Sequence, residues 1–388
     1  MPKRSLAGYP RPDGRVGFRN YLLVLPSCVC SAHAAALVGQ NVPEAVTIAH
    51  SHGCSQIPSD ADFTAEQLIG CATNPNVAAV IVVGLGCEQV PSERLADGIA
   101  AAGVPVKRVV IQDEGGTKKA VAKATRLAKK MLGKIAKIER EPVGFESLIF
   151  ATECGGSDAF SGIAANPAVG AASDMMVEAG GTVILSETTE MIGAEHVLRE
   201  RGVTPQVSGE VVAMVKRCED LMEQLGTHTI GGNPSWGNLK GGISTLEEKS
   251  LGCIFKAGRA PIQEVIEFGD KPTKRGLVVM DTPGNDVESC TGMAAGGAQV
   301  CAFTTGRGSP TGCAMMPVIK VASNTPMFEH LKPNMDVNAG TIGEGKEAIE
   351  EVGERIFRTI VKVVNGKMTK AEKLGHREFA LHRRSWTF

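Results

Sequence analysis

Two imidazoles and a thiol follow one short apolar run near the start of this 388-residue chain. The stretch 44-EAVTIAHSHGCSQ-56 places His50, His52 and Cys54 on a single turn. Imidazole nitrogen and thiolate sulfur are ligands that iron, zinc and similar metals accept in proteins. A turn needs a glycine such as Gly53, but it does not need three such ligands. The turn is therefore a candidate site, and a crowded structural loop is the alternative.

Two further Gly-Cys turns offer the same kinds of ligand. Cys87 and Glu88 end a second apolar run, and Cys154 ends a third. Ligands on separate loops leave coordination positions open for a substrate, as a catalytic metal requires. We predict Cys54, Cys87, Glu88 and Cys154 as metal ligands, with Fe(II) as the expected ion and another divalent metal as the alternative. Each cysteine taken singly can instead be a small apolar group packed under a helix start.

Acidic and basic side chains follow later apolar runs. Glu187 and Glu190 end one such run, and Lys249 follows two glutamates in 246-LEEKSLG-252. A lysine that is desolvated beside carboxylates can act as a base toward a proton next to a carboxylate group. We predict Lys249, His50, Glu187 and Glu190 as catalytic residues, with Lys249 preferred to His50 as the base. Charged residues that only favour a helix start are the alternative.

The glycine-rich stretch 304-TTGRGSPTG-312 has the composition of an anion-binding loop. Its glycines expose backbone amides, and Arg307 supplies a guanidinium that suits a carboxylate or a sulfonate. It is not a P-loop, because no GK[ST] follows. A long loop expected at 226–244 contributes Asn233 and Asn238. These two residues, Arg307 and Asp158 are the predicted substrate contacts.

The elements that must position these side chains are strands and helices in alternation. Apolar runs at 21–27, 45–51, 77–88 and 104–114 alternate with helical stretches, and the pattern resumes at 147–158 and 182–190. Such alternation predicts βαβ units and parallel sheets. The predicted fold class is α/β, with Rossmann-like βαβ units. Open parallel sheets bind ligands beyond the carboxyl ends of their strands, so the polar loops are expected to converge there.

A break near 138–146 divides the chain into two predicted domains. Residues 1–142 are expected to form an N-terminal α/β domain suited to dimerisation. Residues 143–388 are expected to form a C-terminal Rossmann-like catalytic domain, with later strands at 276–284 and 298–308 and a helix at 343–366. Six polar stretches follow apolar runs, and their number predicts a single site assembled from these polar strand ends. They are HSHGCSQ, GLGCEQ, ECGGSD, SETTE, DTPGND and TTGRGSPTG.

Composition and charge argue against several classes of function. A net charge of −1 gives no sign of nucleic-acid binding. No apolar run is long enough to span a membrane, and MPKRSLAGYPRPDGR is not a signal peptide, so a cytoplasmic location is expected. The 11 scattered cysteines contain no CxxC and do not form a secreted disulfide framework.

Taken together, the motifs resemble those of a known family. They are 8-GYPRPDGRVGFRN-20, 50-HSHGC-54, 84-GLGCE-88, 153-ECGGSDAFSGIAANPAVG-170, 247-EEKSLG-252 and 304-TTGRGSPTG-312. The set is similar to that of the altronate and galactarate dehydratase family over residues 8 to about 380. The resemblance implies a lyase that uses divalent iron to eliminate a leaving group from an anionic hydroxy acid.

The resemblance also implies a partner. Family members commonly carry a small N-terminal β-clip domain of the SAF type, whereas the family signature here begins at residue 8. The expectation is therefore a large subunit, itself a homo-oligomer, that works with a small SAF-domain subunit. The reaction expected of this layout removes sulfite from (2R)-3-sulfolactate to give pyruvate. Loss of water from altronate or a related sugar acid, and a non-catalytic scaffold subunit, are the alternatives.

Overall fold

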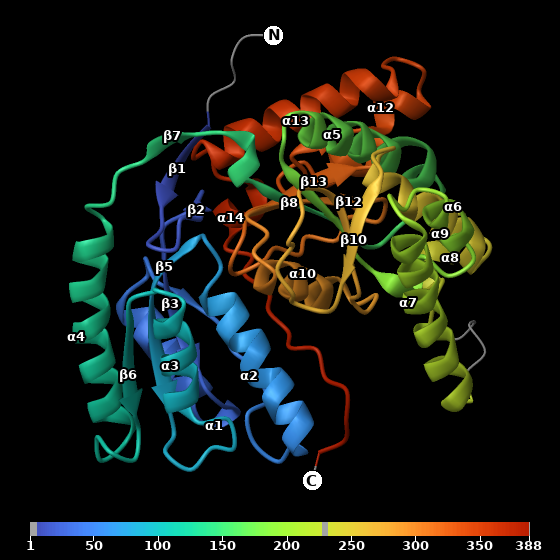
Figure 1. The fold of residues 1–388 in the computed structure, drawn as a ribbon. Coiled ribbons are helices and arrows are strands. Elements are labelled where there is room, and N and C mark those ends of the chain that lie inside the picture. The colour runs from blue at the N-terminus through green and yellow to red at the C-terminus, as the bar shows by residue number, and fades with distance from the viewer. Residues whose placement is uncertain (1–5, 227–231, 388) are drawn as a thin grey trace.

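The computed structural model of the chain describes residues 6–226 and 232–387 (Figure 1). Figure 1 shows the N-terminal elements, in blue and cyan, beside the later elements, in green to red. Both groups of elements contain a parallel sheet, so the α/β class with parallel sheets is confirmed. Residues 227–231 of the predicted long loop lie outside the described residues.

The smaller parallel sheet has four strands in the order β4-β3-β5-β6. They are β4 (Val46–Thr47), β3 (Tyr21–Pro26), β5 (Val77–Gly84) and β6 (Val106–Val110). Helices cover both faces of this sheet, which explains why its central strands are apolar at successive positions. Leu23 and Leu25 pack on the side of α2 (Pro58–Ala72) and α3 (Ser92–Ala101). Leu22 and Val24 pack on the side of α1 (Val29–Asn41) and α4 (Thr117–Ile135).

The larger parallel sheet has seven strands in the order β10-β11-β9-β8-β12-β13-β14. They are β8 (Ile149–Cys154), β9 (Thr182–Leu185), β10 (Ile262–Ile266), β11 (Gly276–Met280), β12 (Val300–Thr305), β13 (Val318–Ala322) and β14 (Val337–Asn338). From β8 the chain first proceeds to β9 on one side and later places β12 on the other. The carboxyl ends of β8 and β12 therefore mark the topological switch point, where open α/β sheets bind ligands.

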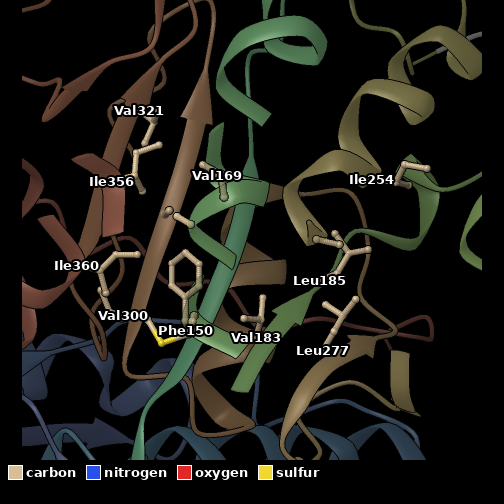
Figure 2. Close-up of a cluster of buried hydrophobic side chains, with 14 of the residues drawn as sticks. Phe150, Val169, Val183, Leu185, Ile254, Leu277, Val300, Val321, Ile356 and Ile360 are labelled. Carbon is tan, nitrogen blue, oxygen red and sulfur yellow. The ribbon is translucent and has the colours of Figure 1, made fainter. Parts of the chain in front are cut away.

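One face of the larger sheet is covered by α5 (Asn166–Glu178), α7 (Pro205–Gln224) and α13 (Ile349–Val364). Figure 2 shows Phe150 of β8 near Val169 of α5, with Ile356 and Ile360 of α13 in the same cluster. The opposite face packs on α10 (Asp286–Ala295), which in turn contacts α2. Helices from both halves of the chain therefore fill the space between the two sheets.

Short antiparallel strands link the two ends of the N-terminal region. Strand β1 (Leu6–Pro10) pairs with β2 (Val16–Gly17) and with β7 (Glu141–Val143). The sequence did not predict this small sheet, because the strands are too short for a periodic signal. The predicted domain boundary at 142/143 falls inside β7 and remains a prediction.

The remaining helices are short. They are α6 (Glu195–Arg199), α8 (Trp236–Lys240), α9 (Leu246–Cys253), α11 (Thr325–His330), α12 (Gly340–Gly343) and α14 (Lys370–Leu374). Helices α6 and α7 are separate, because Pro205 starts a new helix that Thr204 caps. Among the described residues, no helix has both the length and the apolar character needed to cross a membrane.

Candidate active site at the carboxyl edge of the larger sheet

One face of a short helix delivers three functional side chains to the end of β8. Lys249, Cys253 and Lys256 lie in α9 and the 3-10 turn that follows it, at spacings of four and three residues. Residues at these spacings lie on the same side of a helix. Helix α9 begins where the Thr245 side chain accepts a hydrogen bond from the Glu248 backbone N–H at 3.1 Å, as expected of an N-cap threonine.

Two buried thiols and a carboxylate meet at the end of β8. Cys154 Sγ lies 3.0 Å from Glu190 Oε2 and 3.3 Å from Cys253 Sγ. Cys253 Sγ donates to Glu190 Oε2 at 2.7 Å. Lys256 Nζ, on a fully buried side chain, donates to Cys154 Sγ at 2.9 Å. We refer to Cys154, Glu187, Glu190, Lys249, Cys253 and Lys256 as the buried cluster.

Lys249 is held as an ammonium by its contacts. Its Nζ lies 2.5 Å from Glu190 Oε1 and donates to Asn233 Oδ1 at 2.7 Å. Burial is the largest single cause and lowers the pKa of Lys249, but the charge and hydrogen bond of Glu190 and the charges of Cys154 and Cys253 together outweigh it, and the net effect raises the pKa above its usual value. The structure thus differs from the expectation of a neutral amine. Lys249 is a cation at neutral pH, because its nearest charged neighbour is a carboxylate.

Glu187 occupies a strained backbone conformation directly after β9. Its φ of 71° lies in the left-handed region, which costs a non-glycine residue about 1–3 kcal/mol. The backbone N–H of Glu187 donates to Thr282 Oγ1 at 2.8 Å, and its carboxylate accepts from the Cys154 N–H at 3.0 Å and pairs with Lys256. Burial and the nearby Glu190 raise the pKa of Glu187 to about 7.

A second acidic group lies beside the first. Glu153, Glu187 and Asp286 each place a carboxylate oxygen within 4.8 Å of the others. Burial and the charge of Glu187 raise the pKa of Glu153 well above its usual value, which favours the neutral carboxyl. Asp286, in the first turn of α10, sits against Gly155, where a Cβ atom would overlap its Oδ2. Burial likewise raises the pKa of Asp286.

A cavity of about 550 Å³ opens beside these groups. Its volume is that of a small-molecule site. Its polar and glycine lining includes Gly155, Gly156, Glu190, Asn233, Asn238, Lys249 and Asp286. Four residues predicted from the sequence, namely Glu190, Lys249, Asn233 and Asn238, are therefore brought together. A second cavity of about 210 Å³ shares Lys249 and is also lined by Asp158 and Cys253.

Two residues predicted to contact the substrate, Asp158 and Asn238, instead form hydrogen bonds with other residues of the chain. Asp158 accepts hydrogen bonds from Ser161 N–H at 2.8 Å, Ser323 Oγ at 2.7 Å and Asn324 Nδ2 at 2.9 Å. It therefore joins the loops after β8 and β13. Asn238 donates to Ser157 O at 2.9 Å, while its Oδ1 accepts from the N-cap residue of α8. Both residues position the loops around the cavity.

The glycine-rich loop 304–312 does not form the predicted anion cradle. The N–H groups of Gly306 and Arg307 donate to Gly156 O at 3.1 and 2.8 Å, and that of Gly308 donates to Thr305 Oγ1 at 2.9 Å. These amides are used to fold the loop, so they are not available for a ligand. The Arg307 side chain is exposed and is not part of the lining of either cavity.

The predicted residues of the N-terminal half lie at the edge of the smaller sheet. His50 Nε2 is 2.9 Å from Pro26 O, and its Nδ1 accepts from the His52 N–H at 3.3 Å. Burial lowers the pKa of His50 to about 4, so its ring is neutral with both nitrogens in use. Glu88 accepts from Ser27 Oγ at 2.9 Å. His50 and Glu88 therefore use their polar atoms in hydrogen bonds that stabilise the loops around them.

The six polar strand ends are therefore divided between two sheets. Those containing Cys54 and Cys87 follow β4 and β5, and the other four follow strands of the larger sheet. Within the described residues, neither Cys54 nor Cys87 lines the two cavities beside the buried cluster. The prediction of one site is corrected in this respect, because topology assigns its residues to two edges.

Sequence reasoning missed Cys253, Lys256 and Asp286 as site residues. A signal for the first two was present, since they follow Lys249 at helical spacing. Asp286 is the last residue of 281-DTPGND-286, a polar stretch that follows an apolar run. This position alone is a weaker indication of a site residue. Neither pattern shows by itself that the side chains face one cavity.

The buried cluster lies at the topological switch point of a parallel sheet. This is the position of the active site in α/β enzymes. The chain belongs to the family described as D-galactarate/Altronate dehydratase, whose C-terminal part it matches over residues 145–387. It also matches D-galactarate dehydratase/Altronate hydrolase, second domain, over residues 8–136. The resemblance inferred from the motifs is thus confirmed.

Named relatives cover nearly the whole chain. It is 36% identical to (2R)-sulfolactate sulfo-lyase subunit beta of Chromohalobacter salexigens, over 98% of this chain and 97% of that protein. It is 34% identical to altronate dehydratase of Bacillus subtilis, over 97% of this chain and 77% of that protein. It is 38% identical to galactarate dehydratase (L-threo-forming) of Escherichia coli, over 94% and 73% respectively. These relatives are lyases and dehydratases, so the chain is a lyase-family enzyme.

Proposed function

We propose that this chain is the large subunit of a metal-dependent lyase that eliminates sulfite from (2R)-3-sulfolactate to give pyruvate. The observation that carries the proposal is the 550 Å³ cavity, which is lined by both Lys249 and Asp286 and lies beside a cluster of thiol and carboxylate groups that could bind a metal. Coverage of 97% of the sulfo-lyase β subunit at 36% identity supports sulfite as the leaving group. Loss of water from a sugar acid is the second candidate, favoured by the dehydratase relatives.

The buried cluster suits a divalent metal by donor type and spacing. Cys154, Cys253 and Glu190 offer ligand atoms within 4.8 Å of one another, and thiolate with carboxylate is a donor set that Fe(II) accepts. Metal binding removes the thiol protons. Two thiolates and two carboxylates would then be balanced by the metal and by the ammonium groups of Lys249 and Lys256. When bound there, Fe(II) would supply Lewis-acid stabilisation of negative charge on the substrate.

The side chains around the cavity have separable roles in this proposal. Lys249, oriented by Glu190 and Asn233, binds the anionic groups of the substrate. Asp286 is the proposed base that takes the C2 proton, because it is a carboxyl group that lines the same cavity as the Lys249 ammonium. The C2–H electron pair forms the C2–C3 double bond as the C3–S bond breaks and sulfite leaves. The enol product then tautomerises to pyruvate.

A partner subunit is part of the proposal. The name of one relative, subunit beta, implies that this relative has a second subunit. In the present chain, exposed apolar side chains line the second cavity. Ile163, Leu251 and Phe255 in its lining are 60%, 41% and 52% exposed. Exposed apolar residues around a cavity mark a surface that a partner can cover. Closure would exclude water and strengthen the electrostatic contacts inside.

The proposal is tested by coexpressing the chain with a small SAF-domain subunit and loading the complex anaerobically with Fe(II). Incubation with (2R)-3-sulfolactate should release sulfite and pyruvate in equal amounts. Incubation with altronate or galactarate should give little 2-keto-3-deoxy acid. Keto-acid formation from a sugar acid, without sulfite release from sulfolactate, would establish the dehydratase alternative. No turnover of any of the three by the folded, iron-loaded complex would reject both.

Two variants separate the roles of the cavity residues. Asp286→Asn should lower kcat by about 10²–10⁴-fold, the usual contribution of a general base, with little change in KM. Lys249→Met should raise KM because the cation that binds the substrate is lost. If Lys249→Met instead abolishes exchange of the C2 proton with solvent while Asp286→Asn retains it, Lys249 is the base.

A further inference from the structure

Two thiols of the buried cluster lie in contact with each other. Cys154 Sγ and Cys253 Sγ are 3.3 Å apart, and both side chains are buried. Because a disulfide bond is about 2.0 Å long, the sulfur atoms have to approach from 3.3 Å by about 1.3 Å to form one. A movement of this size is within the range of a side-chain rotation.

The backbone segments that carry the two thiols are held in place before any bond forms. Cys154 is the last residue of β8, and its N–H donates to Glu187 Oε2 at 3.0 Å. Cys253 is the last residue of α9. The residue before it packs closely on a neighbouring turn, since a Cβ atom at Gly252 would lie 2.9 Å from Gly162 Cα. Folding alone therefore brings the two sulfur atoms together.

Charged groups around the thiols suit the proton transfers that disulfide formation requires. The Cys253 thiol donates to Glu190 Oε2 at 2.7 Å, so a carboxylate is in position to take its proton. Lys256 Nζ lies 2.9 Å from Cys154 Sγ, where an ammonium stabilises a thiolate. Thiolate is the form of cysteine that is readily oxidised. The cluster thus supplies a base for one thiol and a cation for the other.

The two thiols differ in their access to the cavities beside the cluster. Cys253 lines the cavity of about 210 Å³, whereas Cys154 lines neither cavity in the described part of the chain. A cavity of this volume holds more than one water molecule, so a small peroxide can enter it. Cys253 is therefore the thiol that meets an oxidant, and Cys154 is the thiol that can react with the product.

We propose that Cys154 and Cys253 form a reversible disulfide when the metal-free chain meets a peroxide. The Cys253 sulfur attacks one peroxide oxygen and the O–O bond breaks. The thiol proton, accepted by Glu190, passes to the leaving hydroxide and gives water. The Cys154 sulfur then attacks the sulfur of the Cys253 sulfenic acid, and the S–O bond breaks to release a second water with the Cys154 proton. Two thiols lose two electrons, and one peroxide is reduced to two waters.

The disulfide removes ligands from the cluster. Cys154 and Cys253 are two of the three residues in their group of potential metal ligands, and a cysteine binds a metal as thiolate. Oxidation therefore prevents metal binding by this group until a reductant restores the thiols. This consequence rests on the proposed metal site, whereas formation of the disulfide does not.

The test uses the full chain, freed of metal with a chelator and treated at neutral pH with a small excess of hydrogen peroxide. Denaturation in iodoacetamide stops the reaction, and mass spectrometry without reduction identifies linked peptides. We expect a Cys154–Cys253 link in most chains and its disappearance after dithiothreitol. The same treatment in urea should give at least about tenfold less of this link, because only folding holds these two of the 11 cysteines together.

Two variants test the order of the steps. In Cys154→Ser the Cys253 sulfenic acid has no partner thiol, so dimedone should trap it. In Cys253→Ser, Cys154 should stay unmodified, because it lines neither cavity. Cys71→Ser is the matched control, since Cys71 is buried elsewhere and a serine can keep its hydrogen bond to Thr291 O. This control should form the link as the wild type does.

Each outcome decides the assignment. The link in the folded wild type and in Cys71→Ser, with dimedone on Cys253 in Cys154→Ser, supports it. Absence of the link from the folded wild type, or equal formation in urea, would overturn it whether or not the variants fold. Dimedone on Cys154 in Cys253→Ser would overturn the order of the two thiols. Because no readout is turnover or bound metal, these results are independent of the lyase proposal.

Discussion

Two groups of polar side chains occupy the same topological position in two sheets, yet they are built in opposite ways. In the buried cluster of the larger sheet, Glu187 pairs with Lys256 and Glu190 with Lys249, and all four side chains are largely buried. The second group is Cys30, Cys54 and Cys87 at the carboxyl edge of the smaller sheet, which we call the thiol triad. Two of these three cysteines are exposed, and no carboxylate or ammonium forms an ion pair with them in the described part of the chain. Topology places ligands at a strand edge, but burial and charge decide what those ligands can do.

The difference has consequences for stability. Groups in the buried cluster depend on one another, because a buried charge without its partner is costly. Groups in the thiol triad lie near water, so each can be changed with little effect on folding. The first site is consequently part of the core of its half of the molecule. The second group lies at or near the surface of its half of the molecule.

The largest expected effect is on the buried ion pair. Lys256→Met retains the apolar stem but leaves Glu187 buried without its ammonium partner. We expect the free energy of unfolding to fall by about 3–5 kcal/mol, measured by urea unfolding at pH 7. Cys87→Ser is the matched substitution in the other group and should change it by about 0.5 kcal/mol or less. Equal effects of the two changes would remove the contrast between the groups.

An intermediate effect is expected where the two regions are joined. Arg19 binds Glu372 of α14 through two hydrogen bonds of 2.8 and 2.9 Å. Burial alone raises the pKa of Glu372, but the bonds and charge of Arg19 lower it below its usual value of 4.5. Glu372→Gln removes the carboxylate charge and leaves Arg19 without its ionic partner. This change should lower the free energy of unfolding by about 2 kcal/mol at pH 7.

The same pair gives a pH dependence with a definite sign. Below pH 4.5, and above the lowered folded pKa of Glu372, the unfolded chain binds more protons than the folded chain. Its contribution to stability is therefore present above pH 4.5 and is lost as the pH falls through the folded pKa. The wild type should lose its advantage over Glu372→Gln in acid, as followed by urea unfolding across that range. A stability difference that stays constant with pH would contradict this origin.

The smallest structural perturbation is chemical labelling of the native protein. Iodoacetamide should modify Cys30 and Cys87, which are exposed, while Cys154 and Cys253 react only when the structure opens. We expect Cys154 and Cys253 to react at least about tenfold more slowly than Cys30 and Cys87, as measured by peptide mass spectrometry over time. Comparable rates at Cys154 and Cys87 would show that the buried cluster is open to solvent.

The sequence by itself determined the fold class and the family. Alternating apolar runs and helical stretches predict parallel sheets, because strands buried on both faces must be apolar throughout. Chemistry-bearing residues at strand ends are also readable, and Glu190, Lys249 and Asn233 do line one cavity. The motifs that carry the family resemblance are local, and local patterns do not depend on the tertiary fold.

Only the tertiary structure decided how the ligands are grouped and charged. Strand order, which no local pattern fixes, assigns Cys54 and Cys87 to one sheet and Cys154 to the other. The same holds for protonation, since Lys249 is an ammonium because Glu190, 59 residues earlier in the sequence, lies 2.5 Å away. Distances between segments remote in sequence set both results, and a pKa depends on those distances more than on residue type.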